Sequence, residues 1–447
     1  MADWFDRWRY GKQYGYKVLF RRQDRRPVGK VGVILADLGM PEEFEPQFYV
    51  DYLRHVFEFS LPRPLQSLVL VDRGIALIDP SNPLAREAFQ PTQLVDMYGS
   101  YTNRAGRPYV ECAVTWRPPG MKRDPSDHGY FLYTGDGPGG APDVCQKTAA
   151  KVVGWYYGHL LPEKKVAWAY QCGLIYADVV AALRERRPTV ECCHARYASM
   201  ASLGNAVEKL LAAGCQTIIY QSYSSPVYSD FEEYGSALVA VHRLVAGRAK
   251  LICADQPGNQ PAMRAAYVHL ISDQLASIPA SASVLLILSR HGHPFRRETM
   301  DLRAHEYRDP LEAEVRLAIQ RWGGQAQVLW SDDEYADAYW DPKGRKRSTL
   351  AAHRFAIDNG FDYALEVPTD FVAENTDLMV LHALKKYVAY GDYDPHAPIA
   401  YPDWERPLVR TFHQGKTTGI YTGCLVGPYR KYVVEAVLGS LLAVLEA

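Results

Sequence analysis

Several residue patterns that would assign a protein to a common class are missing from this sequence. Its eight cysteines form no CxxC pair, and their scatter is unlike a disulfide framework, a zinc site or an iron–sulfur site. The sequence contains neither the GxSxG element of serine hydrolases nor a Walker phosphate-binding loop. We therefore expect free thiols in a reducing compartment, no iron–sulfur cluster and no permanently bound cofactor.

An excess of positive charge and a long apolar run are also missing. The 50 Lys and Arg residues are balanced by 51 Asp and Glu residues, so nucleic acid is not an expected partner. The apolar runs Val284–Leu288 and Val433–Leu445 fall short of the ~20 residues that a membrane span needs. The first residues lack the apolar core of a signal peptide. We expect no transmembrane segment and a cytoplasmic location.

Alternating strand and helix patterns fill most of the chain. Short apolar runs at 31–36, 165–170, 217–220 and 284–288 are typical of strands buried in parallel sheets. Helical periods separate such runs, which predicts an α/β fold whose sheets are covered by helices on both faces. Because the pattern restarts near residue 250, we predict two Rossmann-like, doubly wound lobes with parallel sheets and a cleft between them.

The expected organisation has three parts. Residues 1–30 form a basic, aromatic arm, residues 31–250 form an N-terminal lobe with an insertion at about 61–130, and residues 251–447 form a C-terminal lobe. The charge pattern of the arm is typical of a solvated segment packed on its own lobe. The alternative is a peripheral contact with an acidic protein or a membrane surface.

A histidine follows one of the predicted buried strands. The segment Ser289–Pro294 comes directly after the run 284–288, and ligands of α/β folds bind at the carboxyl ends of the strands. An imidazole can accept a proton near neutral pH or bind a metal ion. Gly292 would let a ligand approach the backbone. His291 is therefore a candidate catalytic and metal-binding residue, the alternative being a histidine that forms hydrogen bonds within its loop.

Acidic residues follow another predicted strand, in the segment 368–377. Asp370, Glu374 and Asp377 stand at i, i+4 and i+7, so a helix would place them on one face. Carboxylates that share a face can bind a divalent cation or relay protons. The alternative is ordinary capping of a helix whose first turns are acidic.

Three other patterns carry less information. The stretch Gly135–Gly140 matches GxGxxG, but Pro138 interrupts it and no acid stands at the ribose-binding distance, which favours a loop that approaches some other ligand. The run Cys192–His194 has no distant partners with metal-ligand spacing. The segment Tyr220–Pro226 offers hydroxyl groups and rings after a further predicted strand.

Taken in order, these motifs resemble those of the ferrochelatases, the family that inserts Fe²⁺ into a porphyrin. The segment Ala36–Pro41 resembles the family's Asn-Leu-Gly-x-Pro strand end, and Arg54 falls at the arginine of its first helix. The segment Ser289–Pro294 resembles Ser-Ala-His-Gly-x-Pro, and Pro368–Leu378 resembles the motif that carries the catalytic glutamate. Weaker matches are Gly139–Pro142, Arg196–Ser199, Tyr220–Ser224 with Tyr234–Ser236, and Arg308–Pro310.

The resemblance implies a divergent member of the class II tetrapyrrole chelatases, a lyase of heme biosynthesis with a porphyrin and a divalent metal as substrates. His291 would be the catalytic histidine, Asp377 would replace the family's glutamate, and Glu374 would be a further catalytic acid. His291 and Asp377 would bind the substrate Fe²⁺. The resemblance also implies a group of substrate-binding residues, namely Pro41, Arg54, Tyr223, Ser289 and Gly292.

Some positions depart from the family pattern. The acids that follow the catalytic glutamate in the family are Leu381 and Lys385 here, and the motif histidine is Asn375. Two alternatives therefore stay open. One is a paralogue that binds a tetrapyrrole or another substrate without inserting a metal. The other is a non-catalytic interaction protein that uses the arm and the insertion as contact surfaces.

Overall fold

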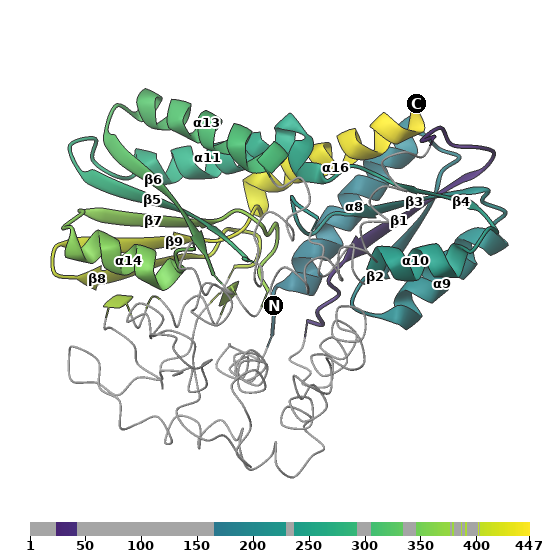
Figure 1. Ribbon diagram of the computed structural model, residues 1–447, viewed down its shortest axis with the longest axis horizontal. Helices are drawn as coiled ribbons and strands as arrows, with labels where there is room; N and C mark the ends of the chain where they lie inside the picture. The colour runs from purple at the N-terminus through teal and green to yellow at the C-terminus, as the bar shows by residue number, and fades with distance from the viewer. Residues whose placement is uncertain are drawn as a thin grey trace, which may run out of the picture.

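The structure is a computed structural model that describes residues 24–42, 165–228, 237–292, 305–333, 346–375 and 403–447, together with residues 378, 379, 386, 389, 390 and 401. These residues form two α/β lobes, each built on its own sheet (Figure 1). The insertion at 61–130, the loop 139–142 and most of the N-terminal arm lie outside the described residues.

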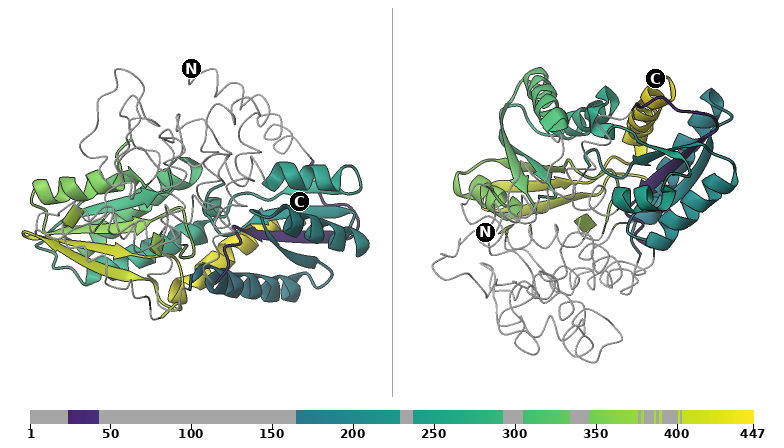
Figure 2. Two further views of the ribbon diagram at one scale, coloured as in Figure 1. Left: turned by 90° about the horizontal axis from the view of Figure 1, so that it is seen from below. Right: turned by 45° about the vertical axis from the view of Figure 1, so that its right-hand side comes forward.

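The sheet of the first lobe is parallel throughout, with the strand order β2-β1-β3-β4. Its strands are β1 (Val31–Asp37), β2 (Glu191–Arg196), β3 (Thr217–Ser222) and β4 (Lys250–Cys253). The side chains from Val33 to Ala36 of β1 are fully buried, as in a strand that is covered on both faces. Helix α8 (Trp168–Arg186) covers one face, and α9 (Met200–Ala212) and α10 (Leu238–Val245) cover the other (Figures 1 and 2).

The sheet of the second lobe has the order β6-β5-β7-β9-β8, and only its edge strand β8 is antiparallel. Its strands are β5 (Ser283–Arg290), β6 (Gln325–Asp332), β7 (Tyr363–Pro368), β8 (Val409–Gln414) and β9 (Thr417–Thr422). Figure 1 shows α11 (Pro261–Ala276) and α13 (His305–Trp322) on one face and α14 (Thr349–Asp358) on the other. The predicted class of two Rossmann-like lobes is thus confirmed.

The C-terminal helix α16 (Arg430–Leu445) connects the two lobes. It packs on α11 of the second lobe and on α8 of the first (Figure 1). Arg430, at its first turn, forms an ion pair with Asp178 of α8 at 2.9 Å. Two short 3₁₀ helices precede longer ones: η5 (Pro257–Asn259) comes before α11, and η7 (Gly427–Tyr429) comes before α16. Both pack against α16.

The structure shows where the boundary between the lobes falls and what the last residues of the arm contact. The boundary expected between residues 250 and 251 falls within β4, which pairs with β3 of the first sheet. Residues 24–30 of the arm contact their own lobe, since Arg25 forms an ion pair with Asp255 at 3.1 Å and donates to the main-chain oxygen of Cys253. Among the described helices, none is long and apolar enough to cross a membrane.

The strand predicted at 165–170 is wrong, because α8 already begins at Trp168. Seven of the nineteen residues of α8 are buried at helical spacing, including Trp168 and Cys172. A short apolar run at the start of such a buried helix has the same composition as a buried strand, so periodicity within six residues does not separate the two.

Candidate functional site

His291 lies directly beyond the carboxyl end of β5. The strand consists of fully buried apolar side chains from Val284 to Leu288, which hold it at the centre of the second sheet. Its last residue, Arg290, forms a bidentate ion pair with Asp332 of β6 at 2.6 and 2.8 Å, and both side chains are buried. The next turn passes through Gly292, whose φ of 82° favours glycine.

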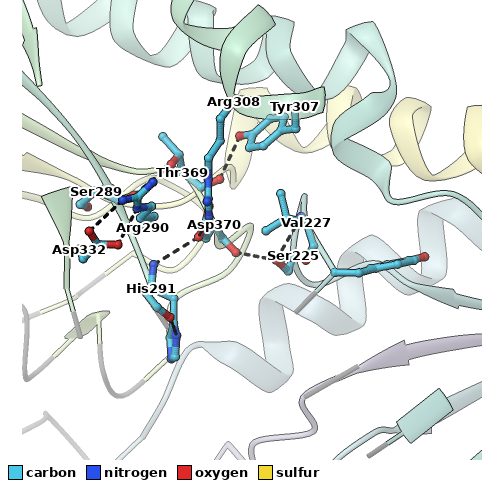
Figure 3. A network of polar contacts seen from close by, with 12 residues as sticks. Ser225, Val227, Ser289, Arg290, His291, Tyr307, Arg308, Asp332, Thr369 and Asp370 are labelled. Carbon is cyan, nitrogen blue, oxygen red and sulfur yellow. Dashed lines mark hydrogen bonds and ion pairs between the residues drawn. The ribbon is translucent and has the colours of Figure 1, made fainter. Parts of the chain in front are cut away.

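The loop after the neighbouring strand β7 binds this turn. The main-chain nitrogen of His291 donates to Oδ2 of Asp370 at 3.3 Å, and the imidazole contacts the Phe371 ring edge-on, with 5.8 Å between ring centroids. Asp370 is held by Arg308 of α13 at 2.7 Å, with both side chains 4% exposed. Figure 3 shows the ring of His291 pointing away from this ion pair and from the pair of Arg290 and Asp332.

The first lobe reaches the same loop. Ser225, which follows β3, donates from its hydroxyl group to the main-chain oxygen of Asp370 at 2.8 Å (Figure 3). In the other direction, the main-chain nitrogen of Val372 donates to the oxygen of Ser224 at 3.3 Å. The loops after β3, β5 and β7 thus meet at the junction of the two lobes, which is where polar ligands of parallel α/β sheets bind.

Glu374 lies on the same loop but is fully buried. Its carboxylate accepts hydrogen bonds from the main-chain nitrogen of Cys424 at 2.7 Å and from the hydroxyl group of Tyr421 at 3.4 Å. Gly423 makes this approach possible, because a Cβ there would collide with Oε1 of Glu374. Burial raises the pKa of Glu374 to about 7, although the Cys424 amide and Arg410 act in the opposite direction.

The remaining predicted site residues differ in accessibility. Tyr223 is fully buried, and its hydroxyl group donates to Asp37 at 2.8 Å. Ser289 is also fully buried, and its hydroxyl group donates to Glu366 at 3.1 Å. Pro41 lies four residues after the end of β1, and Gly292 lies two residues after the end of β5, so both follow the carboxyl end of a strand. Arg54 and Asp377 lie outside the described residues.

A buried charge network next to Ser289 was not predicted from the sequence. Glu366 of β7 contacts Nε2 of His353 and Nζ of Lys386, each at 2.8 Å, and all three side chains are at most 1% exposed. Burial alone would raise the pKa of Glu366, but Lys386 and His353 outweigh it and hold this pKa well below its ordinary value. Burial lowers the pKa of His353. The sequence feature that could have revealed this network is Glu366, a single acid inside the otherwise apolar strand β7.

Within the described ranges, no three His, Cys, Asp or Glu side chains come close enough together to share a metal ion. His291 contributes one imidazole at the loop junction. The expected second ligand, Asp377, is outside those ranges, so the pair stays a prediction.

No protein-family model matches the chain, and no curated protein matches it. Among solved structures, SirB from Bacillus subtilis with Fe³⁺ is similar over 62% of this chain and 88% of its own, with 11% identity and a TM-score of 0.38. An ABC transporter solute-binding protein from Conexibacter woesei is similar over 60% of this chain and 91% of its own, with 8% identity and a TM-score of 0.26. A solute-binding protein from Burkholderia graminis in complex with D-arabinose covers 61% and 86%, with 10% identity and a TM-score of 0.23.

Proposed function

We propose that this chain inserts a divalent metal ion, Fe²⁺ by preference, into a porphyrin, as a step of heme biosynthesis. The observation that supports the proposal is the contact of His291 with the segment 368–375 at the carboxyl ends of two adjacent strands. The sequence resemblance assigns the catalytic histidine to His291 and a further catalytic acid, Glu374, to this segment, with Asp377 two residues beyond it. Two motifs that are about 80 residues apart in the chain are thus neighbours at one sheet edge.

The reaction has a simple balance. A metal ion enters the macrocycle as two pyrrole N–H bonds break, and two protons leave. Nδ1 of His291 lies 2.9 Å from the main-chain oxygen of Gly292, which can only accept, so Nδ1 carries the proton and Nε2 carries the lone pair. In the proposal, Nε2 accepts a pyrrole proton or binds the incoming ion. Asp377 is the proposed second ligand, and Fe²⁺ suits mixed imidazole and carboxylate ligands.

Glu374 is the proposed carrier of protons away from the macrocycle. A general acid or base works best when its pKa is near the working pH, and burial raises the pKa of Glu374 to about 7. Its position beside Tyr421 and the Cys424 amide makes it an acceptor on the far side of the loop from solvent. The ion pair of Asp370 with Arg308 fixes the loop that carries Glu374.

The test is an anaerobic absorbance assay of the purified chain with a porphyrin and Fe²⁺ or Zn²⁺. The expected result is a metal-dependent band shift whose rate falls by about 10²-fold or more in His291→Ala. His413→Ala is the matched control, since His413 is an exposed histidine on the edge strand β8 whose imidazole forms a hydrogen bond with Thr418. Equal rates in both variants would contradict the proposal.

A second candidate is a paralogue that binds the tetrapyrrole without inserting a metal. The observation that favours it is the complete burial of Glu374, whose carboxylate already has two donors and makes no contact with solvent. The same assay separates the two candidates. A porphyrin spectrum that the protein perturbs but never converts, in the wild type and in His291→Ala alike, would support the paralogue. The absence of any porphyrin affinity would favour a non-catalytic interaction protein.

A further inference from the structure

A second pocket lies in the first lobe, away from His291. It has a volume of about 490 Å³ and is formed by the edge strand β2 with helices α8 and α9. Small-molecule pockets occupy roughly 300–1,000 Å³, so the size fits a metabolite. Its lining includes Tyr176, His194, Arg196, Asn205 and Lys209, and contains no Asp or Glu. None of the residues assigned to metal insertion above lines this pocket.

The imidazole ring of His194 is held in a defined orientation in the pocket by Asp37. Its Nε2 lies 2.6 Å from Oδ2 of Asp37, whose side chain is 4% exposed, whereas the side chain of His194 is 38% exposed. A carboxylate only accepts hydrogen bonds, so Nε2 carries a proton and Nδ1 is the ring nitrogen left for a ligand. Nδ1 has no hydrogen-bond partner among the described residues. Tyr176 packs edge-on against the ring, with 5.2 Å between centroids, and limits its rotation.

Asp37 is itself held in place. It is the last residue of β1, and its carboxylate also accepts from the hydroxyl group of Tyr223 at 2.8 Å and from the indole nitrogen of Trp168 at 3.4 Å. Two donors besides His194, one from α8 and one from the loop after β3, fix the carboxylate, and the carboxylate fixes the imidazole. The exposed His194 therefore has a fixed tautomer and ring orientation.

The pocket also holds two cations. Arg196 and Lys209 form no ion pair within the described ranges. The stem of Arg196 packs directly on Gly39, where a Cβ would collide with its side-chain carbons, so the path of the side chain is defined. Burial raises the pKa of Cys192 to about 11 and raises that of Cys193 as well, so both thiols are neutral. The lining is therefore cationic, with neutral sulfur and one oriented imidazole.

We propose that this pocket binds a small molecule through a phosphate group. The group's oxygen atoms would accept hydrogen bonds from Arg196, Lys209 and Asn205, since phosphate is the usual partner of converging cations. A phosphate with a pKa near 6 also keeps an O–H group for part of the time near neutral pH, and this group donates to Nδ1 of His194. A sulfate has the same shape and charge but no such hydrogen atom. The inference does not depend on metal insertion.

The test is isothermal titration of the full chain with inorganic phosphate and with sulfate at pH 6.5, in a buffer free of both. Phosphate is expected to bind more tightly than sulfate. Lys209→Gln is expected to weaken phosphate binding about tenfold, because a charge-assisted hydrogen bond is lost. Lys209 is exposed, so this variant keeps the fold. Lys416→Gln removes the same charge from the second lobe, where Lys416 pairs with Asp362, and should change nothing.

A spectroscopic readout supplements the titration. In chain labelled with ¹⁵N-histidine, phosphate is expected to move the Nδ1 resonance of His194, identified by its loss in His194→Gln, and to leave that of His413 in place. Equal affinity for sulfate and phosphate, equal weakening by Lys209→Gln and Lys416→Gln, or an unmoved His194 resonance would each overturn the proposal. Loss of metal insertion with phosphate binding intact would leave it standing.

Discussion

Two glutamates in the second lobe are both fully buried, yet their pKa values are shifted in opposite directions. Glu366 has a cation, Nζ of Lys386, at 2.8 Å, and this contact with the His353 hydrogen bond keeps its pKa low. Glu374 has only neutral donors at hydrogen-bond distance, and burial therefore raises its pKa to about 7. Proximity to a positive charge, rather than burial as such, decides whether a buried carboxyl group ionises.

The raised pKa of Glu374 predicts a defined dependence of stability on pH. Below the ordinary pKa of 4.5 the group is protonated in both states, so the folded state has its full stability. Between 4.5 and about 7 only the unfolded chain releases the proton, and stability falls by about 3 kcal/mol as pH rises. Glu374→Gln keeps the shape and the acceptor without the proton equilibrium. It is expected to be more stable than the wild type at pH 8 by up to that amount.

Urea unfolding of both proteins at pH 5, 6, 7 and 8 would measure this effect. The difference between the two midpoints should grow with pH up to about 7 and then stay constant, because above that pH the wild-type group is ionised in both states. Asp403→Asn, at an exposed acid, is the control and should track the wild type. A constant difference across the series would show that Glu374 ionises in the folded protein as it does in the unfolded chain.

At the scale of elements, the loop after β7 is fixed from several directions. Arg308 of α13 binds Asp370, Tyr267 of α11 donates to the oxygen of Phe371 at 2.8 Å, and Gln171 of α8 accepts from the nitrogen of Glu374 at 2.8 Å. Each of these elements belongs to the helical layers rather than to the sheet. The conformation of the loop, and with it the position of His291, depends on how the helices pack around it.

Arg308→Met is expected to destabilise the protein by about 3–5 kcal/mol, because it leaves the buried Asp370 carboxylate without its cation. The loop at 368–375 should then exchange its amide hydrogens faster than the strand β7 before it. Denaturant unfolding and hydrogen exchange would measure the two effects. Arg316→Met on the same helix breaks the exposed pair with Glu312 and should cost under about 1 kcal/mol. A similar cost for both variants would mean that Asp370 is not held by charge.

Strands that contain an apolar run were predictable from the sequence, and strands without one were not. The runs at 31–36, 217–220 and 284–288 are apolar on both faces because parallel strands are covered on both sides, and they became β1, β3 and β5. Strand β2 is half-exposed and contains Glu191, His194 and Arg196, so its sequence has no apolar run. Strand β8 is an antiparallel edge with Val409 exposed, and its pattern is equally weak.

The candidate site was predictable only in part, for a related reason. A histidine or an acid at a strand end can be located from the strand, which is how His291 and Glu374 were identified. Partners that come from another element are set by three-dimensional packing alone. Arg308 meets Asp370 across 62 residues, and Asp37 meets His194 across 157. Local patterns contain no information about which distant charge will be the neighbour.

At the scale of the molecule, α16 makes the two lobes one structural unit. Its buried residues are apolar over the whole length from Val433 to Val444, with one polar exception, Ser440, because the helix is enclosed by α8 on one side and α11 on the other. Its two ends also pair with the first lobe, through Arg430 with Asp178 and through Glu446 with Arg187. Helix α16 therefore packs on, and pairs with, the lobe that contains β1.

Leu441→Ala is therefore expected to weaken both lobes together. Leu441 is fully buried on α16, and truncation of such a leucine costs about 2–5 kcal/mol through lost burial and the cavity that remains. Because α16 packs on both α8 and α11, hydrogen exchange should accelerate in both helices by a similar factor. Glu435→Ala, at an exposed position of the same helix, should leave both unchanged within about 0.5 kcal/mol. Acceleration in α11 alone would mean that the first lobe folds without α16, and the two lobes would then be separate cooperative units.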